Sequence, residues 1–265
     1  MGLCASSTTT NPLAAEAAAA RGEVRVPEDC KTLKKAVERV HKENGLTTIV
    51  VGKGKHHIKG DSLEIASAMN IVGDLGVPKS EIVVVGGILF WKGIQGNCHL
   101  QHLTLRQAKM FGVYGESSFT MEDVVVEQCR IGVYAYGTGG VGRCTNVEVR
   151  QCGWSGVVAN RGASITLIGA KTTVHHNSTK KVTVLYKNYT TGDSDDYGLK
   201  VENTMSTDSS SSTIQLVSPL TKQQVSLDNG GGGNWGAGKG GDINQIKTIS
   251  EAELEEAVES DTGSI

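Results

Sequence analysis

A repeated strand motif is the feature that most restricts how this chain can fold. It can be written in register as LTLRQAKMFGVY at 103–114, VVVEQCRIGVY at 124–134 and VEVRQCGWSGVV at 147–158. A fourth, degenerate copy begins at Thr172 with TTVHHN and is completed by YGLKV from Tyr197. The copies start 21, 23 and 25 residues apart. Self-similarity at this period is typical of a solenoid, because one unit cannot bury its own apolar face and must stack on the next.

The strands within each unit indicate which kind of solenoid to expect. Each unit carries two or three short strands joined at glycine, and none has the LxxLxL pattern of a leucine-rich repeat. We therefore expect an all-β fold, a single right-handed parallel β-helix. Because side chains alternate between the two faces of a strand, the first and third residues of LTL, VVV and VEV should point inward. They form two columns, Leu103, Val124 and Val147, and Leu105, Val126 and Val149.

Cysteines also align between units. Cys129 and Cys152 fall at one position beside Ala108, and Cys144 falls in line with Leu100 and Met121. A buried thiol behaves as a small apolar side chain, so we expect all three cysteines to pack in the core.

Charged residues and glycines also recur at fixed positions of the repeat. Charges of alternating sign occupy one outward position, which predicts an exposed ion ladder that fixes the register, formed by Arg106, Glu127, Arg150 and His175. A glycine recurs before each GVY-like stretch, and we expect a turn with positive φ there, at Gly112, Gly132, Gly156 and Gly198.

The repeat also divides the chain into parts. Residues 1–22 have no apolar face and are expected to be a disordered leader, whereas 23–249 should form the β-helix domain. The fourth unit contains a long insert at 178–196, and long loops on a rigid scaffold are common sites of binding specificity. Residues 250–265 form an acidic tail, in which SEAE is a capping-box signature that predicts a short helix.

One helix is predicted at the beginning of the domain. Leu33, Val37 and Val40 recur at helical spacing and make one apolar stripe. We expect a capping α-helix over about 30–44, with Asp29 as its N-cap and Gly45 just past its end.

Charge, cysteine content and hydropathy exclude several classes of protein. The formal net charge is −2, and six acidic residues with no basic ones lie from Glu251 onward, which argues against nucleic-acid binding. The six cysteines show no CxxC or zinc-site spacing, and no apolar run is long enough to span a bilayer. The chain begins without a secretory signal pattern. Cysteines expected to be reduced, together with a start that lacks a secretory signal, predict a cytoplasmic protein.

The first seven residues, MGLCASS, fit a lipid-anchor pattern. Gly2 followed by Ser6 is an acceptor pattern for N-myristoylation. One myristoyl chain holds a protein at a membrane only marginally, so a second signal is needed. Cys4 could take palmitate, and no polybasic patch follows, since Arg21 is the first cation. We therefore expect Gly2 and Cys4 to be acylated and the domain to be tethered to the cytosolic face of a membrane.

Several motifs carry a resemblance to a known superfamily. PEDCKTLKKAVERV followed by IVVGKGKHHI resembles the start of many pectin-lyase-like, right-handed parallel β-helix proteins. NIVGD, CHLQHLTLRQA, RCTNVEV and SITLIGAKTTVHHN look more closely like β-helix repeat proteins of unassigned activity in algae and protists. The resemblance covers 23–249 and implies the fold. Because the superfamily includes pectate lyases, polygalacturonases and mannuronan epimerases, it also implies a carbohydrate-active enzyme as an alternative function.

The acidic residues fit such an enzyme poorly. Polygalacturonase-like members carry an NTD stretch, a DD pair, a GHG and an RIK, whereas here the DD pair Asp195-Asp196 stands without GHG or RIK. We expect this pair to be solvated on a surface loop, where neither carboxyl could serve as the acid of a glycosidase. A lyase-like calcium site would need clustered carboxylates beside a basic residue. The candidates are Glu122, Asp123 and Glu127 with Arg106 and Arg150, but Glu122 and Asp123 are adjacent on a strand and should diverge.

Strand alternation argues equally against metal binding by the two histidine pairs. His56 and His57, and His175 and His176, are adjacent and should point to opposite faces. We therefore assign no catalytic residue, no metal ligand and no cofactor. The sequence favours a binding protein over an enzyme.

Three tyrosines are the candidate binding residues. Tyr114 and Tyr134 share one repeat position, and Tyr136 follows two residues later. Facing outward, they would make an aromatic strip suited to stacking on sugars or to docking a peptide. We expect a non-catalytic scaffold protein that uses this strip, the 178–196 insert, or both to bind an unidentified protein or glycan partner.

Overall fold

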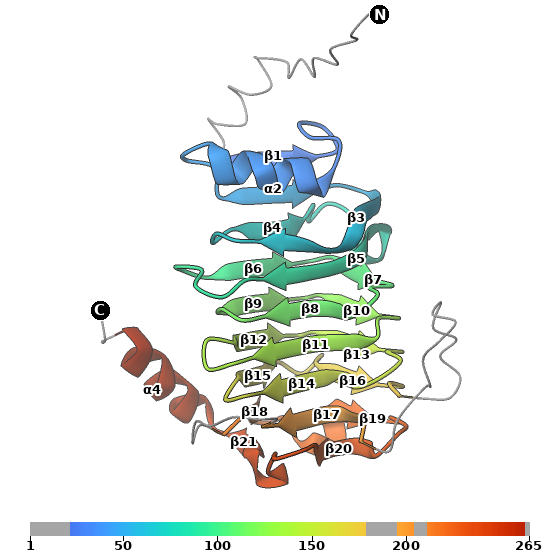
Figure 1. Ribbon diagram of the computed structural model, residues 1–265, viewed down its shortest axis with the longest axis vertical. Coiled ribbons are helices and arrows are strands. Elements are labelled where there is room, and N and C mark those ends of the chain that lie inside the picture. The colour runs from blue at the N-terminus through green and yellow to red at the C-terminus, as the bar shows by residue number, and fades with distance from the viewer. Residues whose placement is uncertain (1–21, 179–194, 204–210, 263–265) are drawn as a thin grey trace, which may run out of the picture.

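The structure is a computed structural model that describes residues 22–178, 195–203 and 211–262. Within these ranges the chain is mostly β, and every strand pairing is parallel. The strands form two sheets, of nine and twelve strands. Figure 1 shows the strands following one another along the long axis, from the N-terminal to the C-terminal end. The sequence-based expectation of a mainly β fold with parallel pairing is confirmed.

The nine-stranded sheet runs the full length of the molecule. Its strands pair in chain order, so that each strand lies beside the next member of the set (Figure 1). They are β1 (Glu23–Val26), β2 (Thr48–Val51), β4 (Asn70–Gly73), β6 (Cys98–Gln101), β9 (Phe119–Glu122), β12 (Val141–Thr145), β15 (Ser164–Ile168), β18 (Thr213–Val217) and β21 (Ile246–Ile249).

The twelve-stranded sheet has two arms that meet at β5 (Ile82–Phe90). The first half of β5 pairs with β7 and its second half with β8, while β3 (Gly54–Ile65) pairs along its other edge. One arm continues through β7 (Thr104–Arg106), β10 (Val125–Glu127), β13 (Glu148–Arg150), β16 (Thr173–His175) and β19 (Ser226–Leu227). The other continues through β8 (Phe111–Gly115), β11 (Ile131–Tyr136), β14 (Val157–Asn160), β17 (Tyr197–Glu202) and β20 (Gly233–Ala237).

The core consists of columns of side chains from successive units. Val126 lies in register between Leu105 and Val149, and all three are fully buried. The neighbouring column of Leu103, Val124 and Val147 is equally buried. Ala108, Cys129 and Cys152 are buried as well, and Cys144 is the register partner of Met121, which in turn pairs with Leu100. The inward columns and the packed cysteines are therefore confirmed.

Five helical segments accompany the sheets in the described ranges. α2 (Leu33–Lys42) packs on β1 and β2 and buries Leu33, Val37 and Val40. Its N-cap is Thr32, whose hydroxyl accepts from the Lys35 amide, so Asp29 was the wrong cap. The remaining segments are η1 (Lys79–Glu81), α3 (Lys222–Val225), η2 (Ile243–Gln245) and α4 (Glu251–Thr262).

The acidic helix α4 begins as its sequence predicts. The Ser250 hydroxyl accepts from the Glu253 amide, and the Glu253 carboxylate accepts from the Ser250 amide, which completes the capping box. In Figure 1 this helix projects from the C-terminal end of the stack. No helix in the described part of the chain is long and apolar enough to cross a membrane.

The repeated glycines have a different cause from the one predicted. None of Gly112, Gly132, Gly156 and Gly198 has positive φ. A Cβ on Gly132 would instead lie 2.3 Å from Val149 Cγ1 and 2.5 Å from the Gly156 carbonyl oxygen. The glycine is therefore required because the next unit approaches too closely for any side chain.

Positive φ occurs at polar residues that follow the strands. It recurs once per unit after β7, β10, β13 and β16, at Gln107, Gln128, Gln151 and His176. Each of these amides donates to a carbonyl of the next unit, so these left-handed corners form part of the backbone ladder between units.

Two parts of the predicted organisation lie outside the described residues. The leader with Gly2 and Cys4, and all but the ends of the 178–196 insert, belong to the ranges that the structure does not describe.

Candidate functional site

The three predicted tyrosines lie together on neighbouring strands. Tyr114 on β8 is the register partner of Tyr134 on β11, and their rings are parallel within 10° with centroids 5.6 Å apart. The Tyr136 ring lies 6.1 Å from Tyr114 and 6.3 Å from Tyr134. Phe111, which the sequence reading missed, joins them with its centroid 5.0 Å from that of Tyr134. We call Phe111, Tyr114, Tyr134 and Tyr136 the aromatic strip, whose members are all partly exposed.

The hydroxyl groups of the strip are held by polar neighbours. Tyr114 donates to Glu116 Oε1 at 2.8 Å, and Tyr134 Oη accepts from Asn160 Nδ2 at 2.7 Å. Burial, and then the Glu116 carboxylate, raise the pKa of Tyr114 far above its usual range. Burial also raises the pKa of Tyr134 to about 12. Both phenols therefore stay neutral at physiological pH, and their rings are held in fixed positions.

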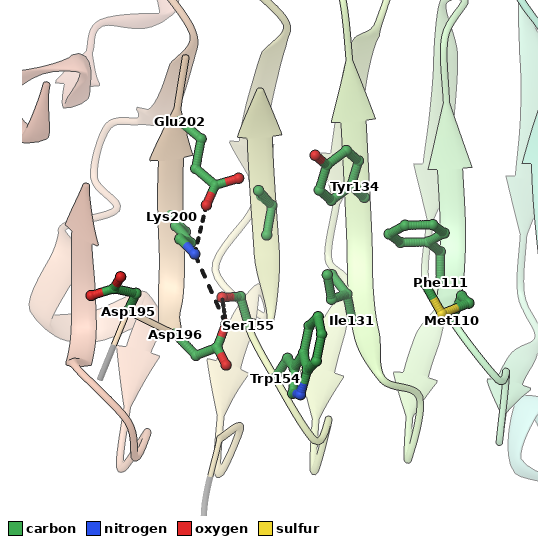
Figure 2. A pocket seen from close by; sticks show the side chains of 11 residues that line it. Met110, Phe111, Ile131, Tyr134, Trp154, Ser155, Asp195, Asp196, Lys200 and Glu202 are labelled. Atoms are coloured by element: carbon green, nitrogen blue, oxygen red, sulfur yellow. Dashed lines mark hydrogen bonds and ion pairs between the residues drawn. The ribbon is translucent and has the colours of Figure 1, made fainter. Parts of the chain in front are cut away.

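A cleft of about 430 Å³ adjoins the strip. Its apolar lining comes from β8, β11, β14 and the residues just before β8 and β14, and its charged lining comes from β17 and the residues before it (Figure 2). The lining residues are Met110, Phe111, Ile131, Tyr134, Trp154, Ser155, Val158, Asp195, Asp196, Lys200 and Glu202.

The polar end of the cleft is an ionic cluster around Lys200. Its ammonium lies 2.6 Å from Glu202 Oε1 and 3.9 Å from Asp196 Oδ1, between the two carboxylates (Figure 2). Ser155 Oγ donates to Asp196 Oδ1 at 3.1 Å, and Asn160 Nδ2 donates to Glu202 Oε2 at 3.2 Å. Asp196 and Lys200 are only 6% and 8% exposed.

The burial of Asp196 corrects the prediction for the Asp195-Asp196 pair. Asp195 is exposed as expected, but Asp196 turns inward, where Ser155 of the preceding unit donates to it. Buried charges are stable when they are paired and hydrogen-bonded, and Lys200 and Ser155 supply both interactions.

Strand register explains why aromatic and charged residues adjoin. Tyr134 pairs with Val158, which pairs with Lys200, and so all three belong to one outward column. Tyr136, Asn160 and Glu202 form the neighbouring column in the same way. The sequence reading missed Lys200 and Glu202 as site residues because it placed YGLKV only within the repeat. Lys200 and Glu202 align with Tyr134 and Tyr136 in the repeat, and this alignment could have identified them as site residues.

Arginines cover parts of two aromatic rings at this face. The Arg130 guanidinium carbon lies 3.4 Å from the Trp154 ring centroid, and that of Arg161 lies 5.1 Å from the Tyr136 ring centroid. The π faces here thus already attract cations.

The predicted ion ladder is present, but its centre is buried. Glu127 is only 2% exposed and lies between Arg106 and Arg150, both of which donate to its carboxylate. Arg150 also contacts Glu148, which accepts from His175. The expectation of an exposed ladder is therefore wrong for Glu127, which packs between two arginine side chains.

The carboxylates considered for calcium do not converge. Glu122 at the end of β9 is exposed, whereas Asp123 has positive φ and contacts Lys79 and His102 instead. Glu127 is enclosed by its two arginines. In the described ranges no group of three or more histidine, cysteine or carboxylate side chains could hold a metal ion.

The histidine pairs also differ from expectation in one case. His175 Nδ1 and His176 Nδ1 lie 2.7 Å apart, because the positive φ of His176 ends the strand alternation that should have separated them. His56 Nε2 contacts the Gly52 carbonyl at 2.8 Å.

Comparison with protein families, with curated proteins and with solved structures finds no match to this chain. The function must therefore be argued from the geometry of the aromatic strip and the cleft.

Proposed function

We propose that this chain is a non-catalytic binding or scaffold protein, built as a single right-handed parallel β-helix of the pectin-lyase-like kind. Pairing in chain order along the nine-stranded sheet, with parallel strands throughout, supports a solenoid rather than a closed barrel. A barrel would bring the first and last strands of a sheet together. In the described pairings β1 and β21 instead lie at opposite ends of their sheet.

The binding face is the aromatic strip together with the cleft beside it. The observation that carries this proposal is the continuity of half-exposed aromatic rings with a cleft of about 430 Å³ that holds a buried, hydrogen-bonded ionic cluster. Binding sites typically combine apolar and aromatic walls with a few fixed polar groups. Aromatic rings with few rotatable bonds also lose little entropy when a partner binds.

The test is binding by the full chain to arrays of defined oligosaccharides and peptides, with hits measured by calorimetry. Tyr136→Ala, which keeps the hydrogen bonds from Asn160 to Tyr134 and Glu202, should weaken a genuine hit by about tenfold or more. Leu75→Ala is the matched control, because Leu75 is an exposed apolar side chain, 69% accessible. Hits that survive Tyr136→Ala unchanged would refute the strip as the binding face.

We further propose that Gly2 and Cys4 carry the lipids that tether the domain to the cytosolic face of a membrane. The support is the MGLCASS pattern and the need for two anchoring signals. Gly2→Ala should move the protein from the membrane fraction to the soluble fraction, and Cys4→Ser should do so in part. Unchanged partitioning of Gly2→Ala would refute the tether.

A carbohydrate-active enzyme is the second candidate. The observation that favours it is that three carboxylates, Asp195, Asp196 and Glu202, line one cleft. Glycoside hydrolysis uses two carboxyl groups across the scissile bond. Turnover of acidic or neutral polysaccharides that is lost in Asp196→Asn would support the enzyme over the binding protein.

A further inference from the structure

The charge of the cleft restricts which chemical class of ligand it can bind. Its lining carries three carboxylates, Asp195, Asp196 and Glu202, against the single ammonium of Lys200. That ammonium is already engaged by Glu202 at 2.6 Å, and Lys200 is only 8% exposed, so it has little left to offer an anion. The formal charge of the lining is therefore negative.

The nearby cations do not reverse this preference. Within the described ranges, Arg130 and Arg161 are positive groups on the adjoining surface, and their guanidinium groups lie over Trp154 and Tyr136. Neither lines the cleft. Their positions show instead that the aromatic rings of this face accept cationic partners.

We infer that the cleft receives a basic side chain of an extended peptide that lies along the aromatic strip. This inference rests on the proposed binding function and names its partner class. A lysine or arginine side chain has an apolar stem for Ile131, Val158 and Tyr134 and a charged end for the carboxylates. The cleft volume of about 430 Å³ lies in the range of small-ligand sites and accommodates such a side chain.

The peptide backbone is assigned to the strip because the two surfaces are continuous. Phe111 and Tyr134 belong to both, so a chain whose side chain enters the cleft passes directly over the neighbouring rings. An acidic polysaccharide or acidic peptide would bring anions against Asp195 and Glu202 and is disfavoured.

The experiment measures binding of fluorescent hexalysine to the full chain by anisotropy at about 0.15 M salt, where long-range attraction is screened. The critical variant is Asp195→Lys, which reverses an exposed charge at the cleft without disturbing the buried pair. The matched control is Glu255→Lys, because Glu255 is an exposed residue of the acidic helix α4, where a polycation could bind without specificity.

We expect Asp195→Lys to weaken hexalysine binding about five- to thirtyfold and Glu255→Lys to change it less than about twofold. Hexalysine acetylated on every side chain, and hexaglutamate, should bind at least about tenfold more weakly than hexalysine. Equal effects of the two variants, or tighter binding of hexaglutamate, would overturn the inference. Spermine that binds as tightly as hexalysine would overturn the peptide assignment, because it has no backbone to place on the strip.

Failure of this inference can be told from failure of the proposed function. If neutral cellohexaose binds and Tyr136→Ala abolishes its binding, the binding face stands and the cationic peptide is wrong. If neither hexalysine nor cellohexaose nor any array ligand binds, both proposals fail together.

Discussion

Glu127 shows most directly how one buried charge depends on the units above and below it. Arg106 precedes it and Arg150 follows it in register, and both donate to a carboxylate that is 2% exposed. Without that carboxylate, two cationic groups would face each other across a single strand. The sequence reveals the alternation of charge, but it does not reveal that the middle member is enclosed by the arginines on either side.

Glu127→Ala should therefore lower the free energy of unfolding by about 3 kcal/mol, the cost of leaving a buried ion pair without one partner. Glu148→Ala, which removes a partly exposed partner of Arg150 and His175, should cost no more than about 1 kcal/mol. Urea unfolding of both variants measures the difference. Equal costs would mean that Glu127 is not held in the enclosed position described.

The repeated glycines provide a second prediction at the residue scale. Gly132→Ala places a methyl group 2.3 Å from Val149 Cγ1 and should cost about 3 kcal/mol or more. Gly137→Ala is the informative comparison, because Gly137 has φ of +72° and no atom within 4 Å of its added Cβ. It should cost only about 1–2 kcal/mol, the penalty of a left-handed alanine. If Gly137→Ala lowered the free energy of unfolding more than Gly132→Ala, the repeated glycines would be required for backbone conformation and not for close packing.

Among the elements, the short helix η1 is fastened to the stack by a polar cluster. Lys79 Nζ lies 2.5 Å from Asp123 Oδ1, His102 Nδ1 lies 2.7 Å from Asp123 Oδ2, and His102 Nε2 contacts the Val77 carbonyl at 2.9 Å. Burial would raise the pKa of Asp123, but the hydrogen bonds from Lys79 and His102 outweigh it and lower the pKa below its ordinary value of 3.8.

A carboxyl group whose pKa is lowered by folding stabilises the folded state at any pH above its ordinary pKa. This contribution disappears as the pH falls through the lowered pKa of the folded state. Asp123→Asn should reduce stability at pH 6 by less than about 1 kcal/mol, because about a third of the Asp123 side chain is exposed. Below pH 3.8 the free energies of unfolding of Asp123→Asn and of the unmodified protein should become more similar. Urea unfolding between pH 6 and pH 2 checks this, with the exposed Asp61→Asn as control. A gap that widens on acidification would contradict the described contacts.

The strands, and which of their side chains point inward, could be predicted from the sequence. The contacts that the outward side chains make with other segments could not. Alternation in VVV and VEV places Val124 and Val126 inward because the pleat has a period of two. The middle residue Thr104 was expected outside but is only 3% exposed, since its hydroxyl donates to the Lys79 carbonyl of η1. That contact joins segments 25 residues apart, which no local pattern reveals.

At the scale of the whole molecule, stacking is what assembles the candidate site. Tyr134, Val158 and Lys200 come from three separate strands and become one column only through parallel register. The tyrosine positions followed from the repeat and could be predicted. The inward turn of Asp196 could not, because it depends on Ser155, which is 41 residues away in the chain.

An open stack of parallel strands also fixes the distance between its two ends. Glu23 on β1 and Lys247 on β21 belong to one outward column of the nine-stranded sheet, linked through Thr48, Asn70, His99, Thr120, Arg143, Thr166 and Gln215. At about 4.8 Å per strand, eight spacings separate them by about 38 Å. Arg143, five spacings from Glu23, lies about 24 Å away by the same rule.

The most direct measurement is pulsed electron paramagnetic resonance between nitroxide labels on Glu23→Cys and Lys247→Cys, in a Cys4→Ser background. The five described native cysteines are buried and should remain unlabelled. An open stack should give a distance near 38 Å for this pair and a distance near 24 Å for the control pair Glu23→Cys and Arg143→Cys. A long pair that measures shorter than the control pair, as a sheet closed on itself would give, would contradict the stack and the binding face built on it.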